Sequence, residues 1–187
     1  MKMMIASDIH GSAYYCKRLL EAYENEKPDK LLLLGDILYH GPRNDLPRDY
    51  APKSVISMLN PIADSILCVR GNCDAQVDQM VLDFDILADY AYIFADGITF
   101  FASHGHIYNE NNPPKARGTV LLNGHTHVPQ FKVYDNCIYV NCGSVSIPKD
   151  NTPHTYLIYS GQTLYFKELS GSIYRTEALF LKGSENL

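Results

Sequence analysis

The sequence predicts an α/β fold in which two β-sheets pack against each other with helices outside them. The first part of the chain alternates apolar, strand-like segments with a helical pattern, which is the order typical of parallel strands. The second part changes to short strand-like segments separated by turn residues, as in hairpins. The chain has 187 residues, a length that suits one domain with a sizeable core. We therefore predict a single domain over residues 1–187.

The first part predicts three strands and two helices. Leu31 to Leu34 form a fully apolar run, which suits a strand buried on both faces. Ser12 is an N-cap for the first helix. Residues 37–53 form a long loop, and loops of more than about 12 residues in a compact domain are usually functional. The secondary structure of residues 78–87 is ambiguous from the sequence. The predicted elements are strands over residues 2–7, 31–34 and 65–70 and helices over residues 12–25 and 54–60.

The second part predicts strands alone, most of them joined as hairpins. Asp96-Gly97 and Asp135-Asn136 each separate two apolar runs, and residues 160–162 separate a third pair. The polar residues 182–187 are predicted to fray. The predicted strands cover residues 90–95, 98–102, 119–122, 131–134, 137–140, 155–159, 163–169 and 173–181.

The composition excludes several classes of protein. The formal net charge of −5 gives no electrostatic footprint for an extended nucleic-acid or membrane surface. It does not exclude a small phosphate ester, because a bound metal can outweigh the net field. Apolar runs are far shorter than the roughly 18 residues that cross a bilayer. The five cysteines are an odd number without paired spacing, and the N-terminus is too short for a signal peptide. These features predict a protein of the reducing cytoplasm.

Side chains that can bind metal follow the predicted strands. Asp36 comes after Leu31–Leu34 and Gly35, and a charge at the end of a buried strand is costly unless it is paired or binds a metal. Five of the seven histidines also stand at predicted strand ends. Ligands of open parallel sheets bind just beyond the carboxyl ends of the strands. The candidate metal ligands are Asp8, His10, Asp36, Asn72, His104, His125 and His127.

The number and type of these ligands indicate two metal ions. Imidazole, carboxylate and amide oxygen suit Mn²⁺, Fe²⁺ or Zn²⁺, whereas the lack of prominent thiolates argues against a structural zinc site. Seven ligands are too many for one open catalytic ion, and they suit two ions that share a carboxylate. Two ions about 3.5–4 Å apart polarise a phosphoryl group and generate hydroxide between them.

In their order along the chain, these motifs resemble those of the calcineurin-like metallophosphoesterase superfamily, and especially its branch of small bacterial YfcE-type phosphodiesterases. The resemblance spans nearly the whole chain, and five motifs in the right order are specific where any one alone is weak. The five motifs are Asp8-Ile9-His10, Gly35-Asp36, Gly71-Asn72-Cys73-Asp74, His104-Gly105 and Gly124-His125-Thr126-His127. Residues 40–44, 77–80 and 143–149 also resemble that branch.

The resemblance implies a four-layer α/β/β/α sandwich of two mixed sheets flanked by helices, the metallophosphoesterase fold. It implies a binuclear metal-dependent phosphodiesterase, in which metal-bound hydroxide attacks phosphorus in line. The substrate is then a small phosphodiester, and a homodimer or homotetramer is expected. Mn²⁺ is the usual activating ion, with Fe, Zn, Ni or Mg as alternatives. One ion would be held by Asp8, His10, Asp36 and His127, and the other by Asp36, Asn72, His104 and His125, with Asp36 as the bridge.

Cys73 departs from the wider superfamily, which commonly has at this position a histidine that protonates the leaving oxygen. A thiol near two cations should have a lowered pKa, and a thiolate cannot donate a proton. Diesters with activated leaving groups should therefore be favoured over alkyl phosphomonoesters. His106 is the alternative proton donor. The candidate catalytic residues are Asp36, Asn72, Cys73 and His106.

Substrate contacts are expected from the long loop and from the two candidate proton-transfer groups. Arg43 and Asn44 are the loop candidates, since guanidinium matches phosphate geometry. Cys73 and His106 complete the predicted substrate-binding set. The alternative function is a non-catalytic scaffold of the same fold, of the kind found in eukaryotic trafficking complexes. Such scaffolds are expected to lose ligands, and here every ligand position is filled.

Overall fold

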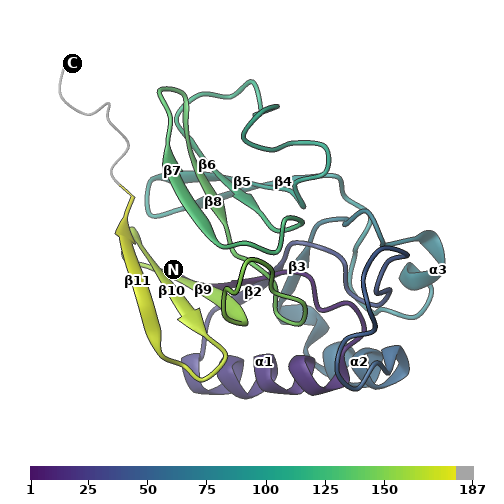
Figure 1. The fold of residues 1–187 in the computed structure, drawn as a ribbon. Helices are drawn as coiled ribbons and strands as arrows, with labels where there is room; N and C mark the ends of the chain where they lie inside the picture. Colours follow the sequence, from purple (N-terminus) through teal and green to yellow (C-terminus); the bar gives the residue numbers. More distant parts are fainter. Residues whose placement is uncertain (180–187) are drawn as a thin grey trace.

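The computed structural model describes residues 1–179 and contains two β-sheets packed face to face (Figure 1). The first sheet has the strand order β11-β10-β9-β1-β2-β3, and the second has the order β4-β5-β6-β8-β7. The strands of the first sheet are β1 (Lys2–Ala6), β2 (Lys30–Leu33), β3 (Ile66–Cys68), β9 (Thr155–Ser160), β10 (Thr163–Glu168) and β11 (Ile173–Ala178). Those of the second are β4 (Ala91–Ala95), β5 (Ile98–Ala102), β6 (Thr119–Asn123), β7 (Gln130–Val133) and β8 (Cys137–Asn141). The helices are α1 (Ala13–Glu26), α2 (Pro52–Leu59), α3 (Gln76–Gln79) and a 3₁₀ helix (Asn60–Ser65).

Alternation of side chains along the strands builds two apolar layers. Ile5 of β1 packs between the sheets with Phe100 and Val140, whereas its neighbour Met4 packs on the opposite face with Leu19 of α1. Successive side chains of a strand point to opposite faces. A central strand such as β1 therefore supplies both the layer between the sheets and the layer beneath the helices. Figure 1 shows α1 and α2 together along the outer face of the first sheet.

The predicted pair of packed sheets with helices outside is confirmed, and each predicted strand forms close to its expected position. The long loop ends two residues earlier than predicted, because α2 begins at Pro52, and proline is favoured at the first helical position. The outer face of the second sheet is covered, within residues 1–179, by Tyr108 from a loop rather than by a helix. Residues 180–181 of the last predicted strand and the predicted frayed tail lie outside the described residues.

The carboxyl ends of the parallel strands meet where the two sheets adjoin. β1, β2 and β3 run parallel in the first sheet, and β5, β6 and β8 run parallel in the second. Backbone hydrogen bonds tie their ends together: the Asp8 N–H donates to the Gly35 carbonyl at 3.1 Å, and the Gly124 N–H donates to the His104 carbonyl at 2.9 Å. All the predicted metal ligands follow strands that end here.

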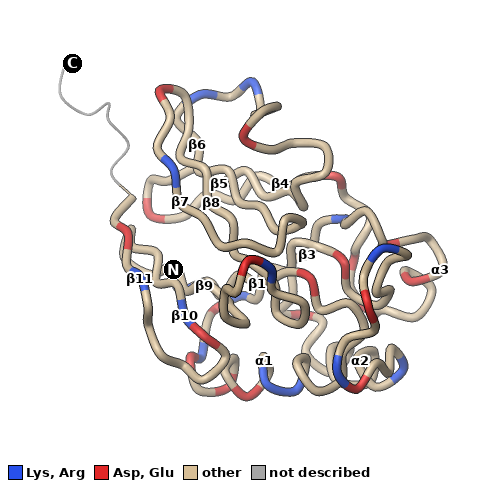
Figure 2. The backbone as a smooth tube through the Cα atoms, viewed as in Figure 1, with Lys and Arg blue, Asp and Glu red and all other residues tan. Residues whose placement is uncertain are grey.

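The charged residues are distributed over the whole fold. Figure 2 shows acidic and basic positions intermixed along the described chain. Among the helices of residues 1–179, none has the length and apolarity that crossing a membrane requires.

Candidate metal centre

Tight turns at the strand ends present the ligand side chains. Five of the seven predicted ligands have a positive φ, a conformation that is uncommon for residues other than glycine. The values are 60° for Asp8, 49° for His10, 56° for Asp36, 64° for His125 and 62° for His127. These turns point consecutive polar side chains into one small volume instead of continuing the strand.

Two glycines allow the turns to approach each other. A Cβ atom at Gly71 would collide with the Asp36 carboxylate and backbone, and one at Gly124 would collide with the Ser7 side chain. Glycine has no Cβ atom, so only glycine permits this close approach. The two glycines thus fix how near the ends of β2 and β3, and of β1 and β6, can come.

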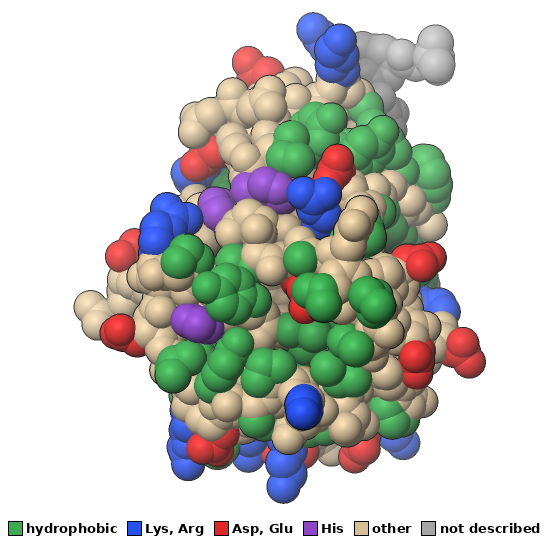
Figure 3. Space-filling model, turned by 90° about the vertical axis from the view of Figure 1, so that its right-hand side faces the viewer, with side chains coloured by type: hydrophobic (Ala, Val, Ile, Leu, Met, Phe, Trp, Pro, Cys, Tyr) green, Lys and Arg blue, Asp and Glu red, His purple; other side chains and the backbone are tan. Residues whose placement is uncertain are grey.

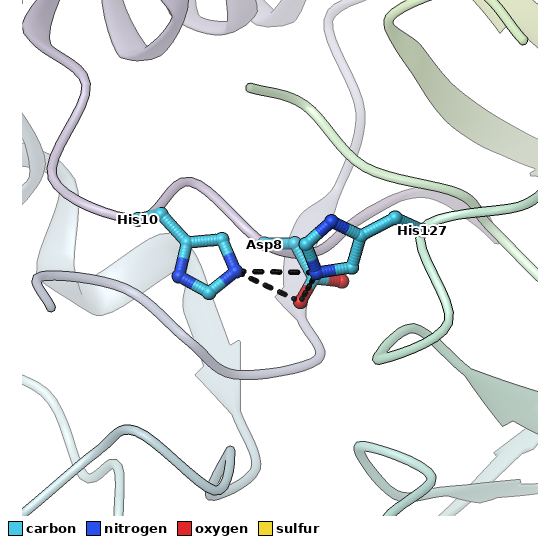
Figure 4. Close-up of side chains that lie close together, drawn as sticks. All are labelled: Asp8, His10 and His127. Carbon is cyan, nitrogen blue, oxygen red and sulfur yellow. Dashed lines mark hydrogen bonds and ion pairs between the residues drawn. The ribbon is translucent and has the colours of Figure 1, made fainter. Parts of the chain in front are cut away.

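The first group of ligands consists of Asp8, His10 and His127 (Figure 4). The Nε2 atoms of His10 and His127 lie 3.3 Å apart, and Oδ1 of Asp8 lies 3.4 Å from the former and 3.2 Å from the latter. Each imidazole donates its Nδ1–H to a backbone carbonyl, that of Tyr39 at 2.8 Å for His10 and that of Ile147 at 2.6 Å for His127. This bond fixes the neutral tautomer, so both Nε2 lone pairs and a carboxylate oxygen face one point.

The second group consists of Asp36, Asn72, His104 and His125. His104 donates its Nδ1–H to the Leu34 carbonyl at 2.7 Å, which again turns the Nε2 lone pair inward. This Nε2 lies 3.0 Å from Asn72 Oδ1, 3.4 Å from Asp36 Oδ2 and 3.2 Å from His125 Nδ1. Four ligand-type atoms therefore converge on a second point.

Asp36 lies between the two groups. Its Oδ2 is 3.7 Å from His10 Nε2 in the first group and 3.4 Å from His104 Nε2 in the second. Its other oxygen, Oδ1, accepts a hydrogen bond from the Cys73 N–H at 2.8 Å. The fold thus brings all seven predicted ligands together, with Asp36 at the position predicted for a shared carboxylate.

The charges of these side chains fit a bound cation. Oδ1 of Asp8 is buried and has no hydrogen-bond partner within residues 1–179. Burial opposes charge on Asp8, yet the adjoining imidazoles of His10 and His127 hold its pKa well below the usual range. Burial likewise opposes charge on His104, but the Asp36 and Asp8 carboxylates raise its pKa to about 9. Two buried carboxylates facing imidazole nitrogens need positive charge, which a divalent ion supplies when bound.

Asp74 supports the centre and was not among the predicted site residues. Its buried carboxylate accepts hydrogen bonds from the N–H groups of Asp36 at 2.8 Å, Ile37 at 2.9 Å and Gly71 at 2.7 Å. It thereby holds the turn after β2 against the turn after β3. The sequence places Asp74 two residues after Asn72, but nothing in that spacing reveals whether the carboxylate faces a metal or the backbone.

A cavity of about 380 Å³ opens onto the ligands. Arg43 and Asn44, the predicted substrate contacts of the long loop, line it together with Cys73. Thr126 and Lys149 also line it and were missed. Thr126 could have been found from its place between two ligands. For Lys149 the sequence offers only its place at the end of residues 143–149, which resemble the same branch of the family.

The two predicted proton-transfer residues differ in position. Cys73 lines the cavity, and burial together with the Asp36 carboxylate raises the pKa of its thiol to about 12. The protein groups alone therefore shift this pKa in the direction opposite to the expected one, and a lowered pKa would have to come from bound cations. His106 lies beside the ligands, with its ring centroid 5.5 Å from that of His104 and 6.2 Å from that of His125.

Comparison with known proteins relates this centre to a family. Residues 1–163 match the calcineurin-like phosphoesterase superfamily domain. The chain is 45% identical to phosphodiesterase YfcE of Escherichia coli strain K12 over 157 residues, which is 83% of this chain and 85% of that protein. It is 22% identical to phosphodiesterase MJ0936 of Methanocaldococcus jannaschii over 151 residues, 76% of this chain and 83% of the relative. The solved structure of Yfce, a phosphoesterase from E. coli, has a TM-score of 0.92 at 41% identity and covers 96% of this chain and 100% of its own.

Proposed function

The chain belongs to the calcineurin-like phosphoesterase superfamily and is a metal-dependent phosphodiesterase, and from this premise we propose that its seven clustered ligands hold two divalent ions. The observation that carries the proposal is the meeting of imidazole Nε2 lone pairs with the Asp8 and Asp36 carboxylates at two adjacent points. The complete ligand set argues against the alternative of a non-catalytic scaffold. We also propose that the whole chain forms one domain.

The distances support a division of the ligands in which Asp36 is shared. Its Oδ2 faces His10 on one side and His104 on the other, as a bridging carboxylate would. When bound, the ions polarise the phosphoryl group and activate water for in-line attack on phosphorus. Nitrogen and oxygen ligands without thiolate suit Mn²⁺, which we propose as the activating ion, with Fe, Zn, Ni or Mg as alternatives. One ion has Asp8, His10, Asp36 and His127 as ligands, and the other has Asp36, Asn72, His104 and His125.

The remaining cavity residues bind and orient the small phosphodiester. The Arg43 guanidinium is able to pair with a phosphate oxygen. The side-chain N–H of Asn44 donates a hydrogen bond to the His40 carbonyl at 2.8 Å. This bond stabilises the loop that carries Arg43 and Asn44. Cys73 and His106 are the two groups near the reacting phosphoryl through which a proton could pass. When bound cations deprotonate the Cys73 thiol, it is no longer an acid, and diesters whose leaving groups depart without protonation are then favoured.

We also propose a cellular location and an oligomeric state for the protein. The five cysteines are free thiols, which supports a reducing cytoplasm. Phe94 on β4 and Val133 on β7 are exposed apolar residues at opposite edges of the second sheet, and they support association into a homodimer or homotetramer.

Hydrolysis of bis(4-nitrophenyl) phosphate tests the proposed function. We expect turnover with Mn²⁺, its loss on addition of a chelator, and its return on addition of excess Mn²⁺. Elemental analysis of the Mn²⁺-loaded protein should give two ions for each chain. A single ion would refute the binuclear arrangement, and chelator-insensitive turnover would refute the metal-dependent mechanism.

A further inference from the structure

A second cavity adjoins the metal cavity. Its volume is about 430 Å³, and it lies between the loop after β2, helix α2 and helix α3. Cys73 lines both cavities, so its side chain stands at the boundary between them. A group that extends from the metal ligands past Cys73 would reach this second cavity, which we call the apolar subsite.

The two cavities differ in chemistry. The metal cavity is bordered by the cationic side chains of Arg43 and Lys149. The apolar subsite is lined mainly by aliphatic and aromatic side chains, including Leu38, Tyr50, Val77 and Val81. Val77 and Val81 are 65% and 45% exposed, respectively. Figure 3 shows hydrophobic side chains gathered on this face of the molecule, below a group of histidines with basic side chains beside them.

The apolar subsite has one charged lining residue within residues 1–179, and that residue is already engaged. The Asp78 carboxylate accepts a hydrogen bond from the Ala75 N–H at 2.9 Å and so caps helix α3. A negatively charged group in the subsite would meet this carboxylate and no lysine or arginine of the described chain. An uncharged apolar group would instead leave water and contact the side chains of Tyr50, Val77 and Val81, which is favourable because apolar surface is removed from water.

We infer that the apolar subsite holds one ester group of the phosphodiester substrate, and that this group is an uncharged alkyl or aryl group. The inference rests on the proposed function: a phosphodiester carries two ester groups on one phosphorus atom, and a phosphoryl group at the metal ligands directs one of them past Cys73. The subsite thus selects diesters with an apolar substituent over diesters whose two substituents are both charged.

Binding of two stable phosphonates tests this inference. Methylphosphonate and hexylphosphonate have the same phosphorus group, cannot be hydrolysed, and differ by five methylene groups. Isothermal titration calorimetry with the Mn²⁺-loaded protein should give a dissociation constant at least about tenfold lower for hexylphosphonate, because each buried methylene adds affinity. Equal constants would overturn the inference.

Variants then locate the binding of the alkyl chain. Val77→Asp and Val81→Asp place a charge on two parts of the subsite wall, and each should bring the ratio of the two dissociation constants to about one. Ile173→Asp is the matched control, since Ile173 is 53% exposed but lies on β11 of the first sheet, and it should keep the wild-type ratio. Both Val77 and Val81 are at least partly exposed, and thermal unfolding of each variant checks that it folds. A ratio that persists in both subsite variants would overturn the inference.

Turnover separates this inference from the proposed function. Chelator-sensitive hydrolysis of bis(4-nitrophenyl) phosphate, together with equal affinity for the two phosphonates, would overturn the apolar subsite alone. Absence of such hydrolysis would overturn the proposed function, and the substrate assignment of the subsite with it.

Discussion

Strand β1 has a carboxylate cluster near each of its ends, partly buried at the amino end and buried beyond the carboxyl end, and the two clusters are neutralised in different ways. Near its amino end, Glu26 of α1 accepts hydrogen bonds from the side chains of Lys2 at 2.9 Å, Lys167, and Tyr156 at 3.2 Å. Beyond its carboxyl end, Asp8 meets imidazoles whose Nδ1–H groups are already bonded to backbone carbonyls. The first cluster, which we call the lysine-paired cluster, receives its positive charge from the chain itself.

The difference shows what identifies a metal centre. A carboxylate that is shielded from water does not by itself identify one, because lysines can satisfy it, as they satisfy the partly buried Glu26. Burial opposes the charge of Glu26, but Lys167 and Lys2 hold its pKa below the usual range. At the other end, the groups facing the carboxylates are imidazole Nε2 atoms, which neutralise the carboxylates only when they carry a proton. A divalent ion takes the place of these protons when it binds, and the orientation of the histidines is the distinguishing feature.

Asp36→Ala should have the largest effect on the metal centre. If Asp36 is the shared carboxylate that we propose, its loss weakens both proposed ions, so we expect Mn²⁺-dependent diester turnover to fall by about a thousandfold or more. Elemental analysis should show both ions lost together. Asp8→Ala and His104→Ala are the controls, each of which should weaken one ion first. Loss of only one ion in Asp36→Ala would contradict the bridging role.

Asp74→Ala should lower stability and metal affinity together. The substitution leaves three buried backbone N–H groups without their acceptor, and each unsatisfied group costs about 1–3 kcal/mol. We expect the free energy of unfolding, measured with urea, to fall by roughly 3 kcal/mol or more. Asp74→Asn keeps one acceptor oxygen and should lie between the wild type and Asp74→Ala. A stability change without loss of metal would show that this carboxylate does not position Asp36.

Glu26→Gln should affect stability alone, with a dependence on pH. Because the pKa of Glu26 is lowered in the folded protein, its stabilisation is present above the unfolded pKa of about 4.5 and is lost as the pH falls through the folded value. At pH 7 we expect the variant to lose about 2 kcal/mol, since hydrogen bonds to charged groups are worth about 1.5–3 kcal/mol. Urea unfolding across pH 3–7 should show this difference shrinking in acid. A changed Mn²⁺ affinity would contradict the independence of the two clusters.

Cys73→Ala should have the smallest effect. Cys73 is not a predicted ligand, so metal content should be unchanged and turnover of activated diesters should fall less than about tenfold, below the usual effect of a general acid. A loss as large as that in Asp36→Ala would show that the thiol takes part directly in the reaction. Preference for simple alkyl monoesters over diesters in the wild type would contradict the proposed role of this position.

Much of the fold follows from local patterns in the sequence. The leucine run of β2 and the Asp96-Gly97 turn between β4 and β5 are local signals, and these elements form where predicted. The order of strands does not follow from such signals. β9 pairs with β1, and β8 inserts between β6 and β7, because these pairings depend on contacts between residues far apart in the chain.

The same distinction between local signals and long-range contacts applies to the candidate site. The seven ligands were predictable because each stands at the end of a strand, and parallel strands bring such ends together. Asp74 and Lys149 were not, since their functions depend on what their side chains face in the folded chain. The apolar subsite was also beyond prediction: it combines residues of the loop after β2 with residues of α2 and α3, whose relative placement is set by packing.

The left-handed turns of the metal centre have a consequence for protein design. Five ligand residues adopt a positive φ, a conformation that costs about 1–2 kcal/mol for a residue with a side chain. The folded scaffold sustains this strain so that the ligands are arranged in advance of the ions. A designer who grafts the seven side chains onto another sheet must therefore also copy these turns, together with Gly71 and Gly124 that let them approach.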